Sequence, residues 1–430
     1  MSTCYENSKS SPIEDTTRLD ITYMLDKYKS FVDQKLVTER SIEIPASILP
    51  KGFTGTLTDV KTKGYGGPQE DQLYSKNEEL RLHLPRGTTY ITIVDTNKNT
   101  TYSEMVIFGN RKFTGSPADE DDSLRPTYSS LYFISPLETA KKVICIEKLN
   151  GEAAHFSGIF IGGVFFLVAG SKNCHILFNS EEQIELYTED RFRIAKIVAR
   201  TVYKYWQSLN DSLRNSIEIE LHESRNTIVC ELLQPAYQHL ISFDTYENAI
   251  TAFTITPPPK NGKVETLISM SPEVVLDKLK SYNLKVPKYE IISPDEVNSK
   301  TTQIRNEYDL EGMVLYYVDE HDHTIALIKV KTKWYIILRA LREKTIFCFY
   351  TKKHKMDTDD AILKSLRRID EFVKWLELNE GEIHFWKNLY EQWFIWLEKI
   401  KDNFKADTMR AEFINQWKKF LEECDLNDRI

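Results

Sequence analysis

The chain has few cysteines, and they lie far apart in the sequence. Six cysteines occur in 430 residues, and no two of them form a C-x-x-C pair. This absence argues against a zinc site or a disulfide framework, both of which need cysteines at short, repeated spacings. Several of the cysteines lie within apolar runs, so we expect reduced core residues of an intracellular protein.

A long uninterrupted apolar run is also missing. A membrane-spanning helix needs about 20 consecutive apolar residues, and no segment approaches that length. Residues 1–15 are polar and show no apolar stretch behind a basic start, so we expect neither a signal peptide nor a membrane partner. We predict a soluble, intracellular protein of the cytoplasm or nucleus, with a disordered tail over residues 1–15.

An excess of positive charge and a P-loop are absent as well. The formal net charge of −8 excludes a general basic coat for nucleic acid, although it leaves room for a local basic cleft. No G-x-x-x-x-G-K-[S/T] segment is present, which excludes a P-loop phosphate site. Any chemistry on phosphates would therefore depend on other residues.

The pattern of apolar residues predicts an α+β chain. Helical spacing favours helices over 19–37, 189–209 and 271–284, the last capped by Ser271. Short apolar runs bounded by turn residues favour strands over 89–95, 105–109 and 131–135, and throughout the β-rich segment 311–350. The segment 114–126 is rich in Pro, Gly and acidic residues and is expected to be an exposed loop.

The character of the chain changes after residue 350. Residues 351–360 are polar and typical of a linker, and residues 359–424 contain no proline, one glycine and apolar residues at helical spacing. We predict one domain over 16–350 and an all-helical domain over 356–430. Its tryptophans are expected in its core, and the basic pair Arg367–Arg368, although able to contact RNA phosphates, is of a kind more often solvated.

Lys148 stands between the apolar run 143–146 and an Asn-Gly pair. A surface lysine beside an Asn-Gly turn would explain the tetrad KLNG without any function. A lysine at the end of a buried strand can instead act as an amine nucleophile, when burial or neighbouring cations lower its pKa. Attack on phosphorus would also need a carboxylate for a ribose, an aromatic ring for a base, and cations for phosphates.

Residues of these types follow the lysine on predicted strands. Glu231 lies within an apolar segment, where a carboxylate needs hydrogen-bonding partners. Glu311 opens the segment EGMVLY. Lys329 and Lys331 stand two apart on one strand, so both project from the same face, and an anionic ligand would relieve their repulsion. The further candidates are Phe253 on a strand and Lys172 in the segment SKN.

Taken in order, these elements resemble the motifs of the covalent nucleotidyltransferase superfamily, which includes ATP-dependent DNA and RNA ligases and mRNA capping enzymes. The asparagine in KLNG, the SKN segment and the Trp-Tyr pair after the two lysines are similar to phage RNA ligases and fungal-type tRNA ligases. Upstream, VIFGNRKFTG resembles their pre-lysine element at Lys112 and Phe113, but Phe108 stands where an arginine is expected. The resemblance spans about residues 105–345.

This resemblance implies a nucleotidyltransferase (ligase) domain built on antiparallel sheets, followed by a small all-α C-terminal domain. It implies an ATP-dependent RNA ligase that uses Mg²⁺ or Mn²⁺. The Lys148 amine would attack the α-phosphorus of ATP to form lysyl-AMP, the AMP would move to an RNA 5′-phosphate, and a 3′-hydroxyl would then displace AMP.

The resemblance also assigns roles to the residues that carry the reaction. Lys329 and Lys331 would hold the α-phosphate and help to lower the pKa of Lys148. Glu311 would orient the lysine, or a metal through water. Glu231 would bind the ribose hydroxyls.

Further contacts are implied around this centre. Phe253 would stack on adenine, and Asn150 and Gly151 would contact ATP while shaping the turn behind the lysine. Lys172 is a candidate for ATP or RNA phosphates, and Lys112 for RNA. The histidines at 321 and 323 lie in an expected hairpin turn and are not predicted to bind metal.

Two alternatives stay open. An mRNA guanylyltransferase shares the lysine chemistry but transfers GMP, and such enzymes end in a β-barrel rather than in helices. A catalytically inert nucleotide- or RNA-binding adaptor would have no need of the nucleophile. The RNA substrate itself is also open, with tRNA halves in splicing and a repaired break as candidates. Healing of the ends, where it is needed, would come from separate enzymes as partners, because the chain contains neither a P-loop nor an H-x-T pair.

Overall fold

Three antiparallel sheets carry the first part of the chain. The computed structural model describes residues 21–63, 68–113, 129–243, 247–259, 266–268, 270–350 and 356–426. The first sheet has the order β1 (Val37–Glu43), β2 (Phe53–Thr62), β3 (Thr88–Asp95), β4 (Thr100–Phe108). The second has the order β10 (Ala249–Thr256), β9 (Thr227–Leu233), β6 (Glu152–Ile161), β7 (Val164–Ser171), β8 (Cys174–Phe178). The third has the order β11 (Tyr289–Ile292), β5 (Lys142–Glu147), β12 (Gly312–Val318), β13 (Thr324–Lys331).

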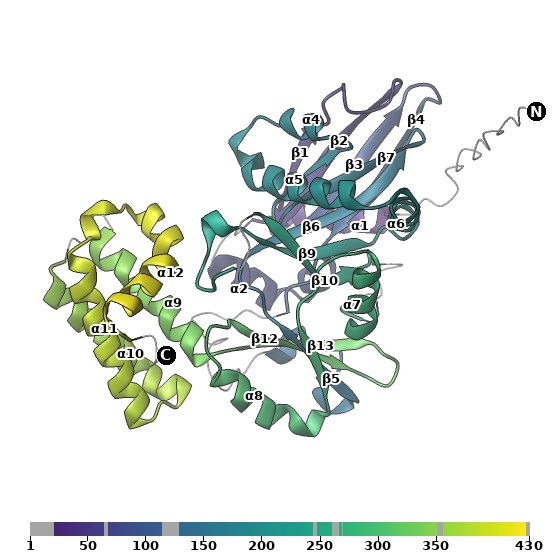
Figure 1. Ribbon diagram of the computed structural model, residues 1–430. Helices are drawn as coiled ribbons and strands as arrows, with labels where there is room; N and C mark the ends of the chain where they lie inside the picture. Colours follow the sequence, from purple (N-terminus) through teal and green to yellow (C-terminus); the bar gives the residue numbers. More distant parts are fainter. Residues whose placement is uncertain are drawn as a thin grey trace, which may run out of the picture.

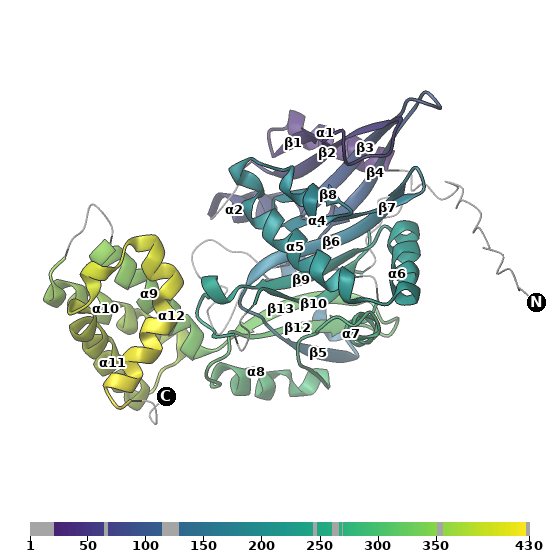
Figure 2. The same ribbon diagram turned by 45° about the horizontal axis from the view of Figure 1, so that its top comes forward.

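The second sheet lies in the middle of this part and is covered on both faces. Strands β2 and β4 of the first sheet contact it, and helix α5 (Arg193–Ser208) packs along β7 and β8 (Figure 2). The helix forms an apolar stripe because its buried side chains recur at helical spacing; they are Ala195, Val198, Ala199, Val202 and Trp206. The sheet and the helix therefore share the largest apolar core of the molecule.

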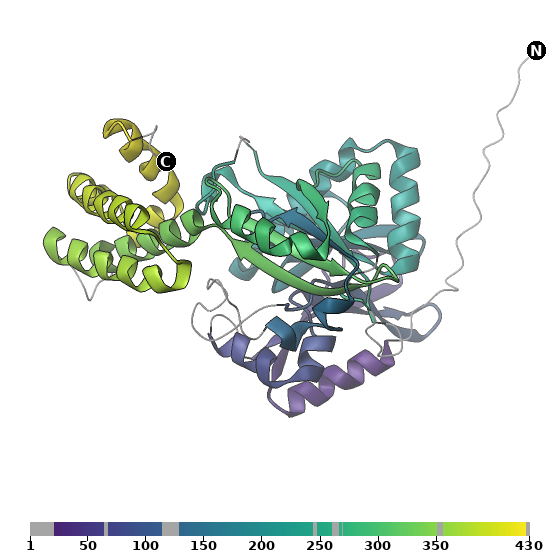
Figure 3. The same cartoon turned by 90° about the horizontal axis from the view of Figure 1, so that it is seen from below.

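The third sheet has two different faces. Ile146 and Tyr316 point into the large core, whereas Cys145 and Leu315 belong to a smaller core with Ile304 of helix α8 (Val297–Arg305). Figure 3 shows α8 lying over β12 and β13 on that outer face. We call the face that bears Ile146, toward the large core, the inner face. Because side chains alternate along a strand, every second residue from Ile146, and the residues paired with these on β12 and β13, project from the inner face.

The other helices pack around the sheets. They are α1 (Thr22–Asp33), α2 (Pro68–Lys76), α3 (Glu78–His83), α4 (Glu181–Glu185), α6 (Asp211–Ser224) and α7 (Pro272–Ser281). α1 and α3 form a separate small core with β1 and part of the first sheet, and α7 packs on β10. None of the described helices is long and apolar enough to cross a membrane.

The C-terminal part consists of helices. α10 (Thr358–Leu376), α11 (Glu380–Glu398) and α12 (Ala406–Glu423) share one core with α9 (Lys333–Thr345), which leads from β13 into them (Figure 1). The core is aromatic, as predicted: Trp386, Trp393, Trp396 and Trp417 are buried, while Trp375 is partly exposed. The boundaries proposed for the two domains stay predictions, since α9 contributes to the helical core from before residue 350.

The predicted class is confirmed, because the chain combines antiparallel sheets with a C-terminal helical region. The three predicted helices correspond to α1, α5 and α7. Ser271 holds the N-cap position of α7, but its hydroxyl donates to Glu273 Oε2 at 2.5 Å instead of accepting a helix N–H. The predicted tail 1–15, the loop 114–126 and the linker residues 351–355 lie outside the described residues.

Two predicted strands are wrong. Residues 131–135 fall partly in a 3₁₀ turn, Ser129–Tyr132. The segment after Lys331 is helical: α9 is followed by a π-helical turn, Ile346–Tyr350. Its aromatic and β-branched residues have high strand propensity, but Thr332 caps the helix by accepting from the Tyr335 N–H at 3.0 Å. Packing of α9 in the helical core then overrides the propensity.

Gly312 is expected to be required for the third sheet. Its φ is +141°, and an added Cβ would lie 2.0 Å from the Val330 carbonyl oxygen. Gly312→Ala should therefore destabilise the protein by about 3 kcal/mol or more, from strain plus steric overlap. Gly163→Ala is the matched control, because Gly163 also has positive φ (+78°) but open space around it, and should cost only about 1 kcal/mol. Urea unfolding of both variants measures the difference; equal losses would contradict the prediction.

Candidate active site

Lys148 lies where the chain passes from the third sheet to the second. Its backbone N–H donates to the Gly312 carbonyl at 2.8 Å, which continues the pairing of β5 with β12. Residues 149–151 then lead directly into β6. The Lys148 side chain is 27% exposed, and its Nζ is 2.9 Å from Oε1 of Glu311. Lys148 is therefore paired with a buried carboxylate and is not a solvated surface residue.

Asn150 ties the turn behind the lysine to its surroundings. Its Nδ2 donates to Glu311 Oε2 at 2.6 Å and to the Tyr335 hydroxyl at 3.0 Å. Its Oδ1 accepts from the backbone N–H groups of Leu240 and Ile241 at 3.0 and 3.3 Å. Asn150 is buried. Its side chain therefore fixes the turn and the orientation of Glu311, which holds the lysine in turn.

Gly151 and Glu231 form the other side of this turn. The Gly151 N–H donates to Glu231 Oε1 at 2.9 Å. A Cβ at residue 151 would lie 2.3 Å from the Leu232 carbonyl oxygen, so only glycine allows this approach to β9. The other carboxylate oxygen, Oε2, has no hydrogen-bonding partner among the residues that the structure describes. It is available to a ligand hydroxyl.

The charges of these groups depend on one another. Burial raises the pKa of Glu231 to about 7, although Lys148 and the Gly151 N–H both act to lower it. Burial alone would lower the pKa of Lys148, but Glu311 and Glu231 outweigh it and raise this pKa above its ordinary value. We predicted that Lys329 and Lys331 would help to lower the pKa of Lys148. That prediction of a lowered pKa is wrong for the unliganded protein, because Glu311 and Glu231 raise the pKa of the amine.

Lys329 and Lys331 project from one face of β13, as predicted. Lys329 pairs with Val314 of β12, which pairs in turn with Ile146 of β5, and Lys331 pairs with Gly312. The two lysines thus share the inner face with Lys148. Lys331 is buried, with its Nζ 5.8 Å from the centroid of the Tyr335 ring.

The glycine at residue 312 and an arginine shape this end of the sheet. Gly312 places no side chain between Lys148 and Lys331. Behind the sheet, the buried Arg305 of α8 donates from Nη1 to the Lys331 carbonyl at 2.8 Å. The end of β13 is therefore fixed from its outer face.

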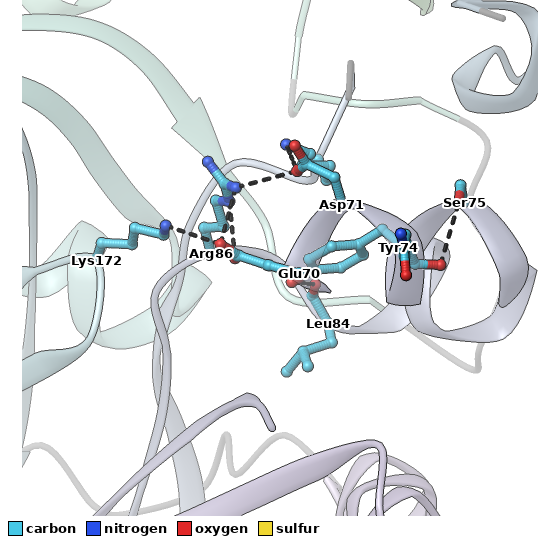
Figure 4. A network of polar contacts seen from close by, with 9 residues as sticks. Glu70, Asp71, Tyr74, Ser75, Leu84, Arg86 and Lys172 are labelled. Carbon is cyan, nitrogen blue, oxygen red and sulfur yellow. Dashed lines mark hydrogen bonds and ion pairs between the residues drawn. The ribbon is translucent and has the colours of Figure 1, made fainter. Parts of the chain in front are cut away.

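Lys112 and Lys172 meet in a cluster of charges beside this face, in contact with α2. Figure 4 shows Lys172 pointing toward Glu70 of that helix. Lys172 Nζ is 3.1 Å from Glu70 Oε2, and Lys112 Nζ is 2.5 Å from Asp71 Oδ1. Arg86 binds Glu70 with two donors, Nε and Nη2, each at 3.0 Å. Burial would raise the pKa of Glu70, but Arg86 and Lys172 hold it below the ordinary value.

The cluster is electrostatically connected to the third sheet. Burial, Arg86 and Lys329 together lower the pKa of Lys112 to about 8, against the opposing effect of Asp71. Burial and Arg86 also lower the pKa of Lys172. The structure thus brings Lys112 and Lys172 together, within the electrostatic reach of Lys329.

Phe253 is not placed by simple alternation. It is the extra residue of a β-bulge in β10, between Ala252 and Thr254, and it is partly buried. Its role in base stacking stays a prediction. His321 and His323 lie in the turn between β12 and β13, where their backbone N–H groups donate to Asp319 Oδ1. Among the described residues no three His, Cys, Asp or Glu side chains gather as a metal site would require.

Two residues of the site were missed in the sequence. Tyr335 was expected on a strand, whereas in the first turn of α9 its hydroxyl reaches Asn150. Thr332, three residues earlier, is a helix-capping residue type and could have revealed the helix. Arg86 lies in a loop between predicted elements and gave no signal.

The arrangement has the parts needed for attack on a phosphorus atom. An amine is held by a buried carboxylate, a second carboxylate has a free oxygen, and two further lysines share the same face of one sheet. Glu311 cannot act as a simple metal ligand in this arrangement, because both of its oxygens are engaged by Lys148 and Asn150. A divalent cation would fit only if it were held through water and ligand phosphates, as Mg²⁺ prefers.

Comparisons with known proteins place the chain as follows. The model of a family described as domain of unknown function DUF7920 matches residues 64–342. No curated protein matches the chain. Two forms of an archaeal ATP-dependent RNA ligase share 13% and 14% identity with it, covering 87% of this chain and 78% of that chain at a TM-score of 0.46. A variant of the Naegleria gruberi RNA ligase, solved with ATP and Mn, shares 9% identity over 69% of this chain and 97% of that chain at a TM-score of 0.32. Identities and scores this low assign no activity to this chain.

The pKa of Glu231 predicts a pH-dependent stability. Between its ordinary value of 4.5 and about 7, the unfolded chain releases the proton while the folded chain keeps it. Raising the pH through this window therefore favours unfolding. Relative to Glu231→Gln, the wild type should lose stability between pH 4.5 and 7 and show no further relative change above pH 7.

Urea unfolding at half-unit pH intervals measures this difference. Glu78→Gln, at an exposed position on α3, is the control for the loss of one surface carboxylate. A difference between wild type and Glu231→Gln that stays flat with pH would show that the carboxyl is not perturbed in this way.

The ion pair with Glu311 predicts the reactivity of Lys148. Glu311→Gln removes the largest influence that raises the pKa of this amine, and each unit by which the pKa falls gives about tenfold more neutral amine below it. At pH 9 the variant should be acetylated at Lys148 by an activated ester at least about tenfold faster than the wild type. Peptide mass spectrometry measures the rate, with the exposed Lys141 as internal reference. An unchanged ratio of the two lysines would refute the assignment.

Proposed function

We propose an activity for this chain, which belongs to the family described as domain of unknown function DUF7920: the ATP-dependent joining of RNA ends through a lysyl-AMP intermediate. The observation that carries the proposal is the Lys148–Glu311 pair, 2.9 Å apart, at the inner end of a sheet that also bears Lys329 and Lys331. A structural lysine would need only one of these features. A nucleophile for a bound triphosphate needs all of them together.

In the first step, Nζ of Lys148 forms a bond to the α-phosphorus of ATP. The bond from that phosphorus to the bridging oxygen breaks, and pyrophosphate leaves with the electron pair. Lys148 starts as the ammonium, because its pKa is raised, and must lose a proton before it attacks. Glu311 Oε1 is the acceptor at hydrogen-bonding distance, so it would take or relay that proton.

The neighbouring residues would position the nucleotide. The available oxygen of Glu231 suits a ribose hydroxyl, and Phe253 would stack on the base. Lys329 and Lys331 would neutralise the α-phosphate, which is the main form of catalysis in phosphoryl transfer. Asn150 and Gly151 would keep the turn in place. Mg²⁺ or Mn²⁺, held by phosphates and through water by Glu311, would neutralise charge on the leaving group.

The second and third steps would join the RNA ends. The 5′-phosphate of one strand would attack lysyl-AMP and release the Lys148 amine, giving an AMP–RNA pyrophosphate. A 3′-hydroxyl of the other strand would then attack that 5′-phosphorus, and AMP would leave. Lys172 and Lys112, with Arg86 beside them, would contact phosphates. The substrates would be RNA ends such as tRNA halves in splicing or a repaired break, after separate enzymes have healed the ends, in the cytoplasm or nucleus.

The proposal assigns the chemistry to residues 16–350 and RNA selection to the helical part over 356–430. A guanylyltransferase would use the same lysine with GTP. An inert adaptor would bind a nucleotide without transfer, and the raised pKa of Lys148 is the observation that favours it. The three activities differ in which label, if any, becomes bound to the protein.

Incubation with α-³²P-labelled ATP or GTP and a divalent cation separates these functions. Label from ATP should remain on the denatured wild-type protein and be lost, to below about one hundredth, in Lys148→Ala, because no other amine replaces the nucleophile. Lys141→Ala, an exposed lysine just before the same strand, should label like the wild type. Label from GTP alone would indicate a guanylyltransferase. No label with either nucleotide on folded protein would indicate an adaptor.

A further inference from the structure

A groove lies between α9 and α10 in the helical region, away from the candidate active site. It encloses a cavity of about 440 Å³. Its polar lining consists of Arg339, Glu343 and Lys344 of α9 and Arg368 of α10, and its apolar lining of Ile336, Ala340 and Phe372. We refer to it as the α9–α10 groove. Three cations and one acid line it, in a chain whose net charge is −8.

The one acidic residue of the groove is already neutralised. Arg410 binds both oxygens of Glu343, at 2.7 and 2.8 Å, and Arg342 donates to Oε1 at 3.1 Å. Burial would raise the pKa of Glu343, but these two arginines keep it below the ordinary value. The groove therefore presents a positive potential. The Arg368 side chain is 19% exposed, and its Nη1 is 2.5 Å from Oε2 of the exposed Glu371.

A fourth cation continues the row. Lys364 lies one turn before Arg368 on α10. Burial raises the pKa of Cys348, and Lys364 and Lys344 both act to lower it, so both lysines lie within electrostatic reach of the same thiol. Neighbouring cations repel one another, and an anionic ligand along the row would reduce that repulsion.

Aromatic rings alternate with these cations. The Arg368 guanidinium carbon is 4.6 Å from the Phe372 ring centroid and 5.0 Å from that of Trp375. Lys364 Nζ is 4.3 Å from the centroid of Phe347. Phe372 is buried, whereas Trp375 and Phe347 are partly exposed. Cations beside partly exposed aromatic faces such as these two are an arrangement by which proteins bind single-stranded nucleic acid, since the cations contact phosphates and the rings stack on bases.

Helix α9 connects the groove with the candidate active site, because it contributes residues to both. The Tyr335 hydroxyl accepts from Asn150 Nδ2, behind Lys148, and Arg339 follows Tyr335 by one helical turn. Burial and Glu311 raise the pKa of Tyr335, whereas Lys148 and Arg339 lower it. From Tyr335 to Lys344 the helix advances by about 14 Å. A strand whose end lies at Lys148 can thus continue along α9.

We propose that the α9–α10 groove binds the phosphodiester backbone of a single RNA strand whose reacting end lies at Lys148. The placement of the reacting RNA end at Lys148 rests on the proposed function, but RNA binding in the groove does not depend on catalysis. RNA is favoured over an acidic protein because the aromatic rings serve bases and because the groove leads from a site suited to nucleotides. Backbone contacts of this kind give affinity without reading sequence.

The salt dependence of RNA binding tests the proposal. A fluorescein-labelled single-stranded RNA of 12 nucleotides with a 5′-phosphate is titrated with the full chain between 50 and 300 mM salt, and binding is followed by anisotropy. For single strands the slope of log K against log salt is about −0.7 per phosphate contact. Lys344→Gln with Arg368→Gln should therefore make the slope shallower by about 1.4 and weaken binding at least about tenfold at 100 mM salt.

Two further variants keep the test specific. Lys399→Gln with Lys419→Gln removes two exposed cations of the helical region that do not line the groove, and should leave the slope unchanged. Arg368→Lys keeps the charge but loses the stacked guanidinium, so it should keep the slope and weaken binding. Thermal unfolding shows that each variant is folded.

The outcomes separate this proposal from the proposed function. Lysyl-AMP formation should be the same in the groove variants and the wild type. If the salt slope depends on the groove residues but the protein forms no lysyl-AMP, RNA binding in the groove is supported and the proposed ligase activity is wrong. An unchanged slope in the double variant would overturn the groove, whatever the labelling shows. Groove-dependent binding of a poly-glutamate peptide, without such binding of RNA, would also overturn it and indicate an acidic protein partner.

Discussion

The ion pair between Lys148 and Glu311 is the interaction on which the rest of the site depends. A buried carboxylate is stable only when charges and hydrogen bonds satisfy both of its oxygens. Here Lys148 takes one oxygen and Asn150 the other, and Asn150 extends the contacts to Tyr335 and to the backbone at Leu240. The crossover between two sheets, the start of β12 and the first turn of α9 thus converge on one carboxylate.

The same pair sets the resting charge of the site. With its pKa raised, Lys148 is a cation in the unliganded protein, and so it attracts a polyphosphate before it can act on one. The proton must then leave before a new bond forms to nitrogen. The site therefore holds the amine in an inactive form, and the change of its surroundings on ligand binding would decide when it becomes reactive.

Strand-borne residues could be predicted because alternation is a local property: Lys329 and Lys331 share a face, and Glu311 at the start of its strand meets the lysine. The helix α9 was not predicted, because the sequence TKWYIIL has strand propensity, which packing with α10–α12 overrides. Its one local signal is the capping residue Thr332. The contact of Arg86 with Glu70 joins two separate segments, and neither segment has a sequence pattern that predicts it. The sign of the Lys148 pKa shift was predicted wrongly because it depends on which charges act most strongly, and spacing along the chain does not give that.

Helix α9 belongs to two structures at once. It begins two residues after Lys331, supplies Tyr335 to the site, and buries Trp334, Ile337 and Leu341 in the helical core. The joint between the two parts of the molecule is therefore a shared rigid element and not a tether. For protein engineering, a chimera that exchanges the C-terminal region for one from another protein would have to cut beyond α9 and preserve the apolar face that this helix presents. A cut directly after β13 would remove α9, and with it Tyr335 of the candidate active site.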